Sequence, residues 1–600
     1  MSALKKIAKK YFQYLYYFYS YLGNRLVLSF LLSVLVGVMD GFGLAMFIPL
    51  LQMVDNTGAA KTNTDGMGNM SFLPSLLEKV GLPLNLFVVL SIILIFFSLK
   101  GLMKFGEAYA RVVYEQFFIR KIRMRNILGL SHFSFNNFIN ADIGRIQNTF
   151  SGEVEKVKQA YRYYFIALQY GIFVAVYVTM AFFSNPKFVS LVIVGGGATN
   201  LLFRFLQKKT KALSHKITVD SHVFQGLLIQ KVAFFKYLKS TGLIHKYAEK
   251  LTKTNDQLHN AQRRSGMYGA ILAAIREPVV ILVVVMAIMI QVYYFHQGIA
   301  VIIFTLLLFY RALISLTGMQ NYSNLFIGSA GSLENMTAFN DELKKGKEVT
   351  GTQPFEKFTD QVKLDHLSFS YKEHKILQDI VLTINKNETI AIVGESGSGK
   401  TTLINILTGL LKPTDGKLLI DNTDLSVYNT TTYQHRIGYI TQEAVVFNDT
   451  IFNNVTFWDQ PTPENIERFE QALRKASIYD FVMMQPLKKD ALLGNNGINV
   501  SGGQKQRISI ARELYKEVDF LFMDEATSAL DSETESEIQE NIEALKGKYT
   551  IVIIAHRLST IKNADRIVLL NKGVISAVGN FDQLVQDSPI FSKMVQLQGF

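Results

Sequence analysis

Long apolar runs constrain what this chain can fold into more than any other feature of its sequence. Each run is long enough to cross about 30 Å of hydrocarbon as a helix. The runs begin near Leu26, Leu84, Tyr163, Phe188, Ile271 and Ile299. Gly195, Gly196 and Gly197 interrupt the fourth run, although small residues also let membrane helices approach closely. The sequence therefore predicts an α-helical membrane domain with six spans over residues 26–340.

The placement of Lys and Arg predicts how these spans are oriented. Basic residues gather in residues 120–125 and between Arg204 and Arg276, whereas the turns near Asn185 and Phe295 carry almost no charge. Basic connections stay on the cytoplasmic side, so both termini are expected in the cytoplasm. The formal net charge of +13 thus lies beside apolar spans, which argues against a nucleic-acid partner. We expect a multi-pass protein of the inner (cytoplasmic) membrane.

Residues 1–25 have the pattern of an amphipathic helix in the membrane interface. Four lysines between positions 5 and 10 fall on one helical face, while Tyr11, Phe12 and other apolar residues fall on the opposite face. A frayed soluble tail is the alternative. No small-residue cleavage pattern follows, so the segment is not expected to be a signal peptide. The chain has no cysteine, which excludes disulfides and thiolate metal sites.

A domain of another kind follows the apolar half. Residues 341–361 are polar and contain Gly and Pro, as linkers do, and residues 362–600 carry mixed charge with strand-like segments. A buried strand at residues 388–393 leads into a complete P-loop pattern, made of Gly394, Glu395, Ser396, Gly397, Ser398, Gly399, Lys400, Thr401 and the following Thr402. Backbone N–H groups of such a loop cradle phosphates, Lys400 reaches the β- and γ-phosphates, and Thr401 offers its hydroxyl to Mg²⁺.

Two acids end a later apolar strand at residues 518–523. Asp524 is placed to hold the Mg²⁺ shell, and Glu525 is placed to polarise an attacking water. Two acids at a strand end are common by chance, but together with a P-loop they indicate nucleotide hydrolysis. ATP and Mg²⁺ are therefore the expected cofactors, and residues 362–600 are expected to form an α/β P-loop nucleotide-binding domain.

The segment from Asn499 to Arg507 is similar to the signature sequence of the ATP-binding cassette (ABC) family, and essentially the whole chain resembles an ABC exporter half-transporter. Its central residues are Ser501, Gly502, Gly503 and Gln504. Further matches in that family's order are Tyr371, Gln442, the loop Ser528–Asp531 and His556.

The resemblance implies a role for each match. Tyr371 stacks on adenine, Gln442 senses Mg²⁺ and the attacking water, and His556 contacts the γ-phosphate. Ser501 begins a helix whose N-terminus faces the ATP held by a second subunit. The implied partner is a second half-transporter, most simply in a homodimer.

This sequence departs from the family in two places. Many exporters carry an acidic residue in the loop before the signature, where this chain has Gly494-Asn495-Asn496-Gly497, so a salt bridge from that loop to the cytoplasmic loops is in doubt. Val500 stands where leucine is usual, which reduces side-chain volume. Neither departure touches the residues assigned to catalysis.

The substrate is less constrained than the energy source. The first span contains an acidic residue, Asp40, followed by glycines and Pro49, a pattern that resembles exporters similar to bacterial lipid-linked oligosaccharide flippases. Arg311 lies in an apolar run of the sixth span, where a cation is costly unless it faces a cavity or a partner. Either Arg311 pairs with Asp40 as a structural element, or it binds a phosphate head group. We therefore expect an ATP-hydrolysing exporter or flippase of an amphipathic lipid or lipid-linked substrate.

Other functions stay open on the sequence. A peptide or drug exporter, or an ATP-gated channel or regulator, would carry the same motifs. An importer usually has separate membrane and cassette chains, and a soluble ABC ATPase needs no spans. A peptide exporter with a fused leader protease would need an extra N-terminal domain, which is not expected here.

Overall fold

The chain forms two compact units. The structure, a computed structural model, describes residues 3–47, 50, 85–184, 186, 189–190, 212–213, 216–217, 219–221, 223–290, 293, 299–524, 540, 543–554 and 561–597. The helical unit comprises Met1–Ser131 and Asp142–Lys345, and the α/β unit comprises His132–Ala141 and Gly346–Phe600. The domain limits predicted at residues 25, 340 and 361 stay predictions.

The described part of the helical unit contains only helices among its regular elements. They are α1 (Ala3–Leu22), α2 (Asn24–Ala45), α5 (Leu86–Ser131), α7 (Ile143–Asn148), a π-helical turn (Thr149–Glu153), α8 (Val154–Ser184), α10 (Phe235–Ser240), α11 (Ile244–Ile290) and α12 (Ile299–Lys345).

Three helical stretches are long and apolar enough to cross a membrane, judged over the described residues. They are Asn24–Ala45, Leu86–Ser131 and Ile143–Phe183, which overlap the first three predicted spans. The fifth and sixth predicted spans begin within α11 and at the start of α12, and the start of the fourth, Phe188, lies outside the described residues. With 46 residues, α5 is about 70 Å long, roughly twice the thickness of a hydrocarbon core.

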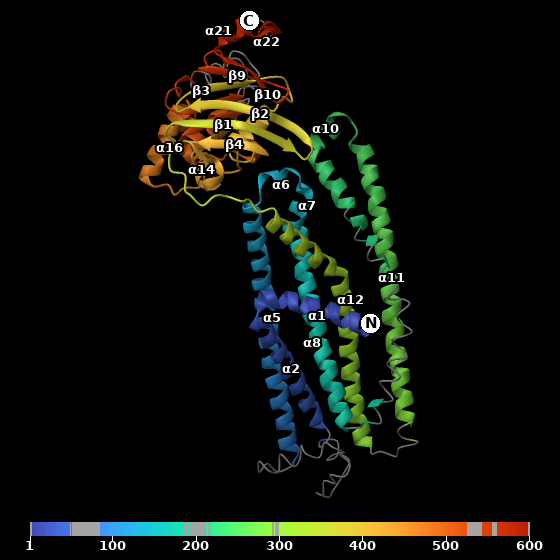
Figure 1. The fold of residues 1–600 in the computed structure, drawn as a ribbon. Coiled ribbons are helices and arrows are strands. Elements are labelled where there is room, and N and C mark those ends of the chain that lie inside the picture. The colour runs from blue at the N-terminus through green and yellow to red at the C-terminus, as the bar shows by residue number, and fades with distance from the viewer. Residues whose placement is uncertain are drawn as a thin grey trace. The chain divides into compact units, whose positions relative to one another are not determined.

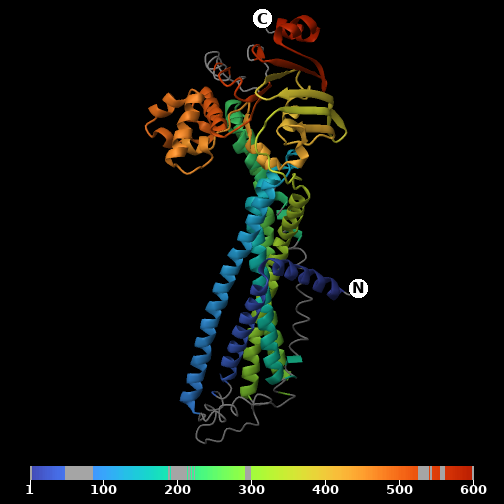
Figure 2. The same cartoon turned by 60° about the vertical axis from the view of Figure 1, so that its left-hand side comes forward.

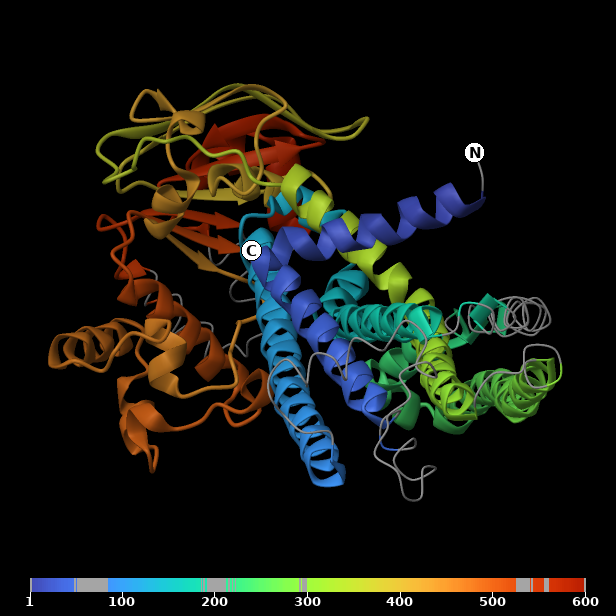
Figure 3. The same ribbon diagram turned by 90° about the horizontal axis from the view of Figure 1, so that it is seen from below.

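Helices of the helical unit pack in pairs. The dark-blue α2 lies along the blue α5 in Figures 1 and 2, and the teal α8 lies against the yellow-green α12, as the view from below in Figure 3 shows. Glycine permits the close approach of α2 to α8, because a Cβ at Gly41 would lie 2.0 Å from Sδ of Met180.

The N-terminal helix α1 crosses the long helices at a steep angle (Figure 1). Its second half packs inward, since Tyr14, Phe18 and Tyr21 are buried in an aromatic cluster with Phe118 of α5 and Tyr161 of α8. Phe18 meets Phe118 edge-on with centroids 5.5 Å apart, and Phe118 stacks on Tyr161 with centroids 5.2 Å apart. Aromatic residues at helical spacing therefore attach this helix to its own unit as well as giving it an apolar face.

The α/β unit contains two sheets and a set of helices. Its elements are α6 (Phe135–Ile139), β1 (Gln361–Tyr371), β2 (His374–Asn385), β3 (Thr389–Val393), α13 (Lys400–Leu407), β4 (Asp415–Ile420), β5 (Thr423–Asp424), α14 (Thr430–His435), β6 (Ile437–Ile440), α15 (Ile451–Thr456), α16 (Pro463–Lys475), α17 (Tyr479–Met484), α18 (Gly502–Tyr515), β7 (Phe520–Asp524), β8 (Thr550–Ile554), β9 (Arg566–Asn571), β10 (Val574–Gly579), α21 (Phe581–Asp587) and α22 (Pro589–Leu597), with short 3-10 turns at Leu425–Val427, Lys488–Asp490 and Asn495–Gly497.

The larger sheet has the strand order β10-β9-β3-β8-β7-β6, and only the β10–β9 pair is antiparallel. The smaller sheet, β2-β1-β4-β5, is antiparallel. Strand β3 is buried along its whole length, as expected for a parallel strand covered on both faces. Helices α15 to α18, orange in Figure 2, form a lobe apart from the smaller sheet. This is the predicted α/β class.

A short segment from earlier in the chain belongs to the α/β unit. Residues 132–141 pair with the start of the later half through the bridge between Phe133 and Lys347 and through the bond from the Ser134 N–H to the carbonyl of Gly346, 2.9 Å long. Phe135 at the start of α6 packs against the apolar core between the sheets. Only the tertiary structure places this segment with residues more than two hundred positions away.

Candidate functional site

Two buried carboxylates inside the helical unit, Asp40 and Glu107, are each paired with a cation. Asp40 of α2 is buried and forms an ion pair with Lys100 of α5, and the Tyr177 hydroxyl of α8 donates to the same carboxylate. Of the two alternatives for Arg311, the structural pair with Asp40 is therefore wrong. Lys100 takes the carboxylate because α5 packs directly along α2. Arg311 on α12 is partly buried and interacts electrostatically with Tyr177.

A second buried carboxylate, Glu107, lies on α5 about two helical turns after Lys100. Glu107 of α5 pairs with Arg111 and accepts hydrogen bonds from Ser33 of α2 (3.3 Å) and Gln169 of α8 (2.6 Å). Ser33, Glu107, Arg111 and Gln169 line a small cavity, together with Ser29 and with apolar and aromatic side chains. Because each charge has a partner, these groups serve first to hold α2, α5 and α8 together.

The P-loop lies at the carboxyl end of the central strand β3, the edge at which parallel sheets bind ligands. Lys400 begins α13 and is buried. Its Nζ donates to the carbonyls of Gly394 (2.8 Å) and Glu395 (2.9 Å), so the lysine holds the loop closed on itself. The loop amides and the N-terminus of α13 form a cradle of the kind that binds phosphates.

Glycine is required at the first position of the loop. A Cβ at Gly394 would lie 2.1 Å from the carbonyl oxygen of Leu570 in β9, which is a backbone atom in a buried strand. Gly397 has φ +80° and no atom within 4 Å of a Cβ placed there. The first glycine, with φ +157°, is thus needed for space and for conformation, and the second for conformation.

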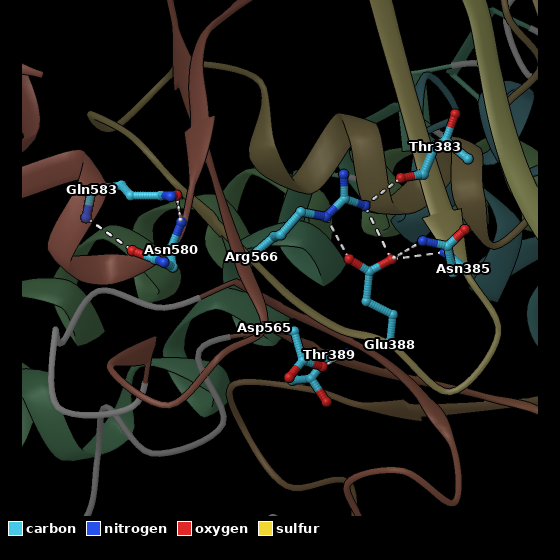
Figure 4. A network of polar contacts seen from close by, with 8 residues as sticks. All are labelled: Thr383, Asn385, Glu388, Thr389, Asp565, Arg566, Asn580 and Gln583. Carbon is cyan, nitrogen blue, oxygen red and sulfur yellow. Dashed lines mark hydrogen bonds and ion pairs between the residues drawn. The ribbon is translucent and has the colours of Figure 1, made fainter. Parts of the chain in front are cut away.

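An ion-pair network fixes the opposite end of β3. Figure 4 shows Arg566 of β9 reaching Glu388, which directly precedes the strand, with one of the two bonds 3.0 Å long. Arg566 also donates to the carbonyl of Thr383 in β2, 2.5 Å away, and Asp565 accepts from the N–H of Thr389 at 2.8 Å. The bidentate pair anchors the strand that carries the P-loop.

Tyr371 ends β1 next to the helix that follows the P-loop. Its ring meets Phe369 edge-on, with centroids 4.8 Å apart. Partial burial raises the pKa of Tyr371, and a hydrogen bond with Thr402 of α13 acts in the opposite direction. The structure therefore brings the predicted adenine-stacking residue and the phosphate-binding loop together.

Asp524 ends β7 beside β6, the strand that leads to Gln442. Because β6 and β7 are parallel neighbours, the Tyr439 hydroxyl donates to Oδ2 of Asp524 at 3.5 Å. Burial, with the negative charge of Asp524, raises the pKa of Tyr439 to about 12. Tyr439 thus stays a neutral donor at physiological pH and orients the carboxylate. The role of Tyr439 could not be predicted from the sequence, since nothing in a strand pattern shows which residue faces a neighbouring strand end.

The signature segment forms the N-terminus of α18. The Ser501 hydroxyl accepts from the N–H of Gln504 at 3.3 Å, and the Gln504 side chain accepts from the Ser501 N–H at 2.9 Å, which makes a capping box. Gly502 and Gly503 are the first two helical residues. The cap fixes where the helix begins and leaves the dipole end free of bulky side chains.

Comparison with known proteins agrees with this arrangement. A family model described as "ABC transporter" matches residues 377–528, which include the P-loop, Gln442, the signature and Asp524. Residues 377–528 form an ABC transporter domain. This domain is an ATPase module that binds ATP.

The whole chain is similar in fold to the structure of a bacterial Atm1-family ABC exporter with ATP bound. The TM-score is 0.77 at 21% identity, over 97% of this chain and 99% of that one. The chain thus has the fold of an ABC exporter half-transporter, with an ABC transporter domain after a helical membrane-type domain.

Several curated relatives carry the name "ATP-dependent lipid A-core flippase". The one from Syntrophus aciditrophicus (strain SB) is 41% identical over 242 residues, which is 40% of each chain. The one from Sodalis glossinidius (strain morsitans) is 40% identical over 250 residues, 43% of that protein. For these two the alignment spans about two fifths of the relative. The one from Francisella tularensis subsp. holarctica (strain OSU18) is 28% identical over 518 residues, 82% of this chain and 81% of the relative.

Some residues assigned to nucleotide hydrolysis lie outside the described residues. They are the predicted base Glu525, the loop Ser528–Asp531 and His556. Their roles stay predictions. The loop before the signature is a 3-10 turn at Asn495–Gly497, with positive φ at Gly494 (+72°) and Gly497 (+64°). The positive φ angles at these two positions account for the glycines found there.

Proposed function

We propose that this chain is one half of an ATP-driven exporter of the flippase type, which moves an amphipathic, lipid or lipid-linked substrate out of the cytoplasmic side of the inner membrane. The observation that carries the proposal is the presence, in one chain, of an ABC transporter domain and of apolar helices long enough to cross a bilayer. The likeness over most of the chain to a relative named "ATP-dependent lipid A-core flippase" supports it. Both termini and the ABC transporter domain would face the cytoplasm.

In this proposal the described residues hold the nucleotide. Tyr371 stacks on adenine, the loop Gly394–Gly399 and Lys400 hold the phosphates, and Lys400 exchanges the carbonyls of its own loop for phosphate oxygens. The donor set of Thr401 and Asp524 fits Mg²⁺, which prefers hydroxyl and carboxylate oxygens and keeps waters and substrate phosphates as further ligands. The ion supplies charge neutralisation on the phosphates.

Hydrolysis then requires a base and a sensor. Asp524, which the Tyr439 hydroxyl contacts at 3.5 Å, directly precedes the predicted base Glu525 in the sequence. Gln442 follows β6 and lies at the same edge of the sheet. His556 contacts the γ-phosphate. The attacking water gives its proton to Glu525, and the bond to the γ-phosphorus forms opposite the leaving diphosphate.

A second copy of the chain is proposed as the partner. Ser501, Gly502 and Gly503 present a helix N-terminus, which attracts phosphate. The hydroxyl and the backbone N–H of Ser501 are both bonded within the capping box. The first turn of α18 is therefore a rigid, preformed face. In the proposed dimer this face meets the ATP held by the partner's P-loop, and each ATP is sandwiched between two chains.

The proposed substrate carries an anionic head group, a phosphate or a pyrophosphate linkage. Asp40 is neutralised by Lys100, which leaves Arg311 as a membrane-depth cation with no carboxylate within 4 Å among the described residues. A guanidinium at that depth favours a phosphate ligand over lipid tails. Asp40 contributes indirectly, through the Tyr177 hydroxyl, which binds Asp40 and also interacts electrostatically with Arg311.

The test is ATP-dependent movement of a fluorescently labelled anionic lipid in proteoliposomes that contain the full chain. Wild type should move the lipid and show lipid-stimulated ATP hydrolysis. Arg311→Ala should lose the stimulation, whereas Arg311→Lys should keep most of it because the charge stays. Lys100→Met is the structural comparison and should lower thermal stability instead, since it leaves Asp40 buried and unpaired. Uptake of a soluble peptide without lipid movement would refute the lipid substrate and leave an exporter.

A further inference from the structure

Arg512 is a buried arginine in the helix that begins with the signature. It lies in α18 with 3% of its surface exposed. Among the described residues no carboxylate lies within 4 Å of its guanidinium, and its immediate neighbour Glu513 is engaged with Lys516 at 2.7 Å. Burial lowers the pKa of Arg512. A cation buried without a counter-ion costs free energy, so its contacts must offset that cost.

Neutral acceptors on two segments take all the contacts of this guanidinium. Nε donates to the carbonyl of Asn454 (2.6 Å), Nη2 to the Asn454 side chain (3.1 Å), and Nη1 to the carbonyl of Val445 (2.8 Å). The Asn454 carbonyl is one of the last four of α15, where unpaired carbonyls favour a cation. The rings of Phe447 and Phe457 cover the Arg512 guanidinium, with centroids 5.3 and 5.4 Å from its central carbon.

Asn454 extends these contacts into one clamp. Its side-chain oxygen accepts from the N–H of Phe447 (2.8 Å), and its side-chain nitrogen donates to the carbonyls of Phe447 (3.0 Å) and Thr450 (2.9 Å). Asn454 is 1% exposed, so these bonds are shielded from water. We call Arg512 and Asn454 together the Arg512 clamp.

The clamp holds the segment that follows Gln442. Val445, whose carbonyl binds Arg512, is three residues beyond Gln442. On the other side, Gln506 of α18 donates to the carbonyl of Thr441 at 3.5 Å and is also buried. The stretch with Gln442 is therefore attached at both ends to α18, the helix whose first turn is the signature.

We propose that Arg512 is a positioning residue that couples the Gln442 segment to the signature helix, and thereby couples the two ATP sites of the dimer. This inference rests on the proposed function, in which Gln442 acts on the ATP of its own chain and Ser501 on the ATP of the partner. A displacement of the Gln442 segment at one site then moves α18 and the signature at the other. Binding and hydrolysis at the two sites become cooperative.

The experiment uses the full chain in lipid nanodiscs and compares Arg512→Lys with wild type. Lysine keeps the charge but has no planar fork to reach Val445 and Asn454 together. Arg468→Lys is the matched control, because Arg468 also donates to a backbone carbonyl at the end of α18 (Tyr515, 3.0 Å) and stacks on a ring, without contacting the Gln442 segment. A fluorescent ATP analogue reports binding, and phosphate release reports hydrolysis.

Arg512→Lys should lower kcat about tenfold or more, leave the Kd of the ATP analogue within about twofold, and bring the Hill coefficient of hydrolysis to about one. The thermal midpoint should fall further than in Arg468→Lys, because Arg512 is buried and loses more hydrogen bonds, so all variants are assayed well below their midpoints. Wild-type kcat and Hill coefficient in Arg512→Lys would overturn the proposal. So would a parallel loss of binding, hydrolysis and thermal stability, which marks a purely structural role. Absence of hydrolysis in wild type would instead contradict the proposed function.

A spectroscopic arm does not depend on activity. Because the chain has no cysteine, Glu443→Cys gives a single site for a nitroxide label beside Gln442. Label mobility should rise when Arg512→Lys is added and should not change with Arg468→Lys. Asn454→Asp tests the other half of the clamp, since it keeps an acceptor for Arg512 but loses the amide bonds to Phe447 and Thr450, and it should raise mobility as well. Unchanged mobility in both clamp variants would refute the coupling.

Discussion

Replacing Gly394 with alanine tests how closely the sheet constrains the P-loop. The added Cβ would lie 2.1 Å from the carbonyl oxygen of Leu570, whereas carbon and oxygen in contact normally stay about 3.3 Å apart. One side must therefore move by about 1 Å. Leu570 is buried in β9, which is paired on both sides with β3 and β10, so the loop should move rather than the strand.

The displacement sets how much the affinity for ATP should fall. Hydrogen bonds from the loop amides to phosphate weaken steeply beyond about 3.2 Å, so a shift of about 1 Å should remove roughly two of them. Each charge-assisted bond is worth about 1.5–3 kcal/mol, which gives about 3–6 kcal/mol in total. That loss corresponds to about 10²- to 10⁴-fold weaker binding of ATP.

Gly397→Ala is the matched control in the same loop. No atom lies within 4 Å of its new Cβ, and only the left-handed backbone (φ +80°) is penalised. That strain is about 1–2 kcal/mol, so ATP binding should weaken by no more than about thirtyfold. The assay is titration of each full-length variant with a fluorescent ATP analogue, beside a thermal unfolding scan. If Gly394→Ala bound the analogue within about threefold of wild type, the assumed rigidity of β9 and of the loop would be wrong.

Three further predictions concern the α/β unit. Glu525→Gln should keep ATP binding and lower turnover about 10²- to 10⁴-fold, measured by phosphate release, because it removes the base; turnover at the wild-type rate would exclude that role. Lys400→Ala and Ser501→Arg subunits should each be inactive alone but recover hydrolysis when mixed, since one mixed interface keeps both motifs; full activity of a demonstrated monomer would contradict shared sites. Glu388→Gln should lower the free energy of unfolding by about 1–3 kcal/mol in denaturant melts, because Arg566 loses its carboxylate, and an unchanged midpoint would show that the network in Figure 4 adds no stability.

The local motifs could be identified from the sequence because their chemistry needs few residues at short spacing. The P-loop spans Gly394 to Thr401, and a strand followed by a glycine turn and a helix is enough to predict a phosphate cradle. The structure has this order, with β3 before the loop and α13 after it. The class of the second domain and the apolar helices follow in the same way, since periodicity and run length are properties of a single segment.

Side-chain partners across elements could not be identified from the sequence. Charge and depth suggested Arg311 as the partner of Asp40, but α5 packs along α2 and brings Lys100 to that carboxylate. Sequence gives the depth of a residue in a span, whereas helix packing and rotation decide which side chains meet.

What the sequence by itself determined is the set of elements and the chemistry of each motif: apolar helices, a P-loop, a signature helix and an acidic strand end. The tertiary structure alone decided which of these are connected. It brings Tyr439 to Asp524, and it places Arg512 between Val445 and Asn454. Contacts over tens of residues depend on strand order and helix docking, which arise when the whole chain buries its apolar faces at once and leave no periodic trace in any one segment.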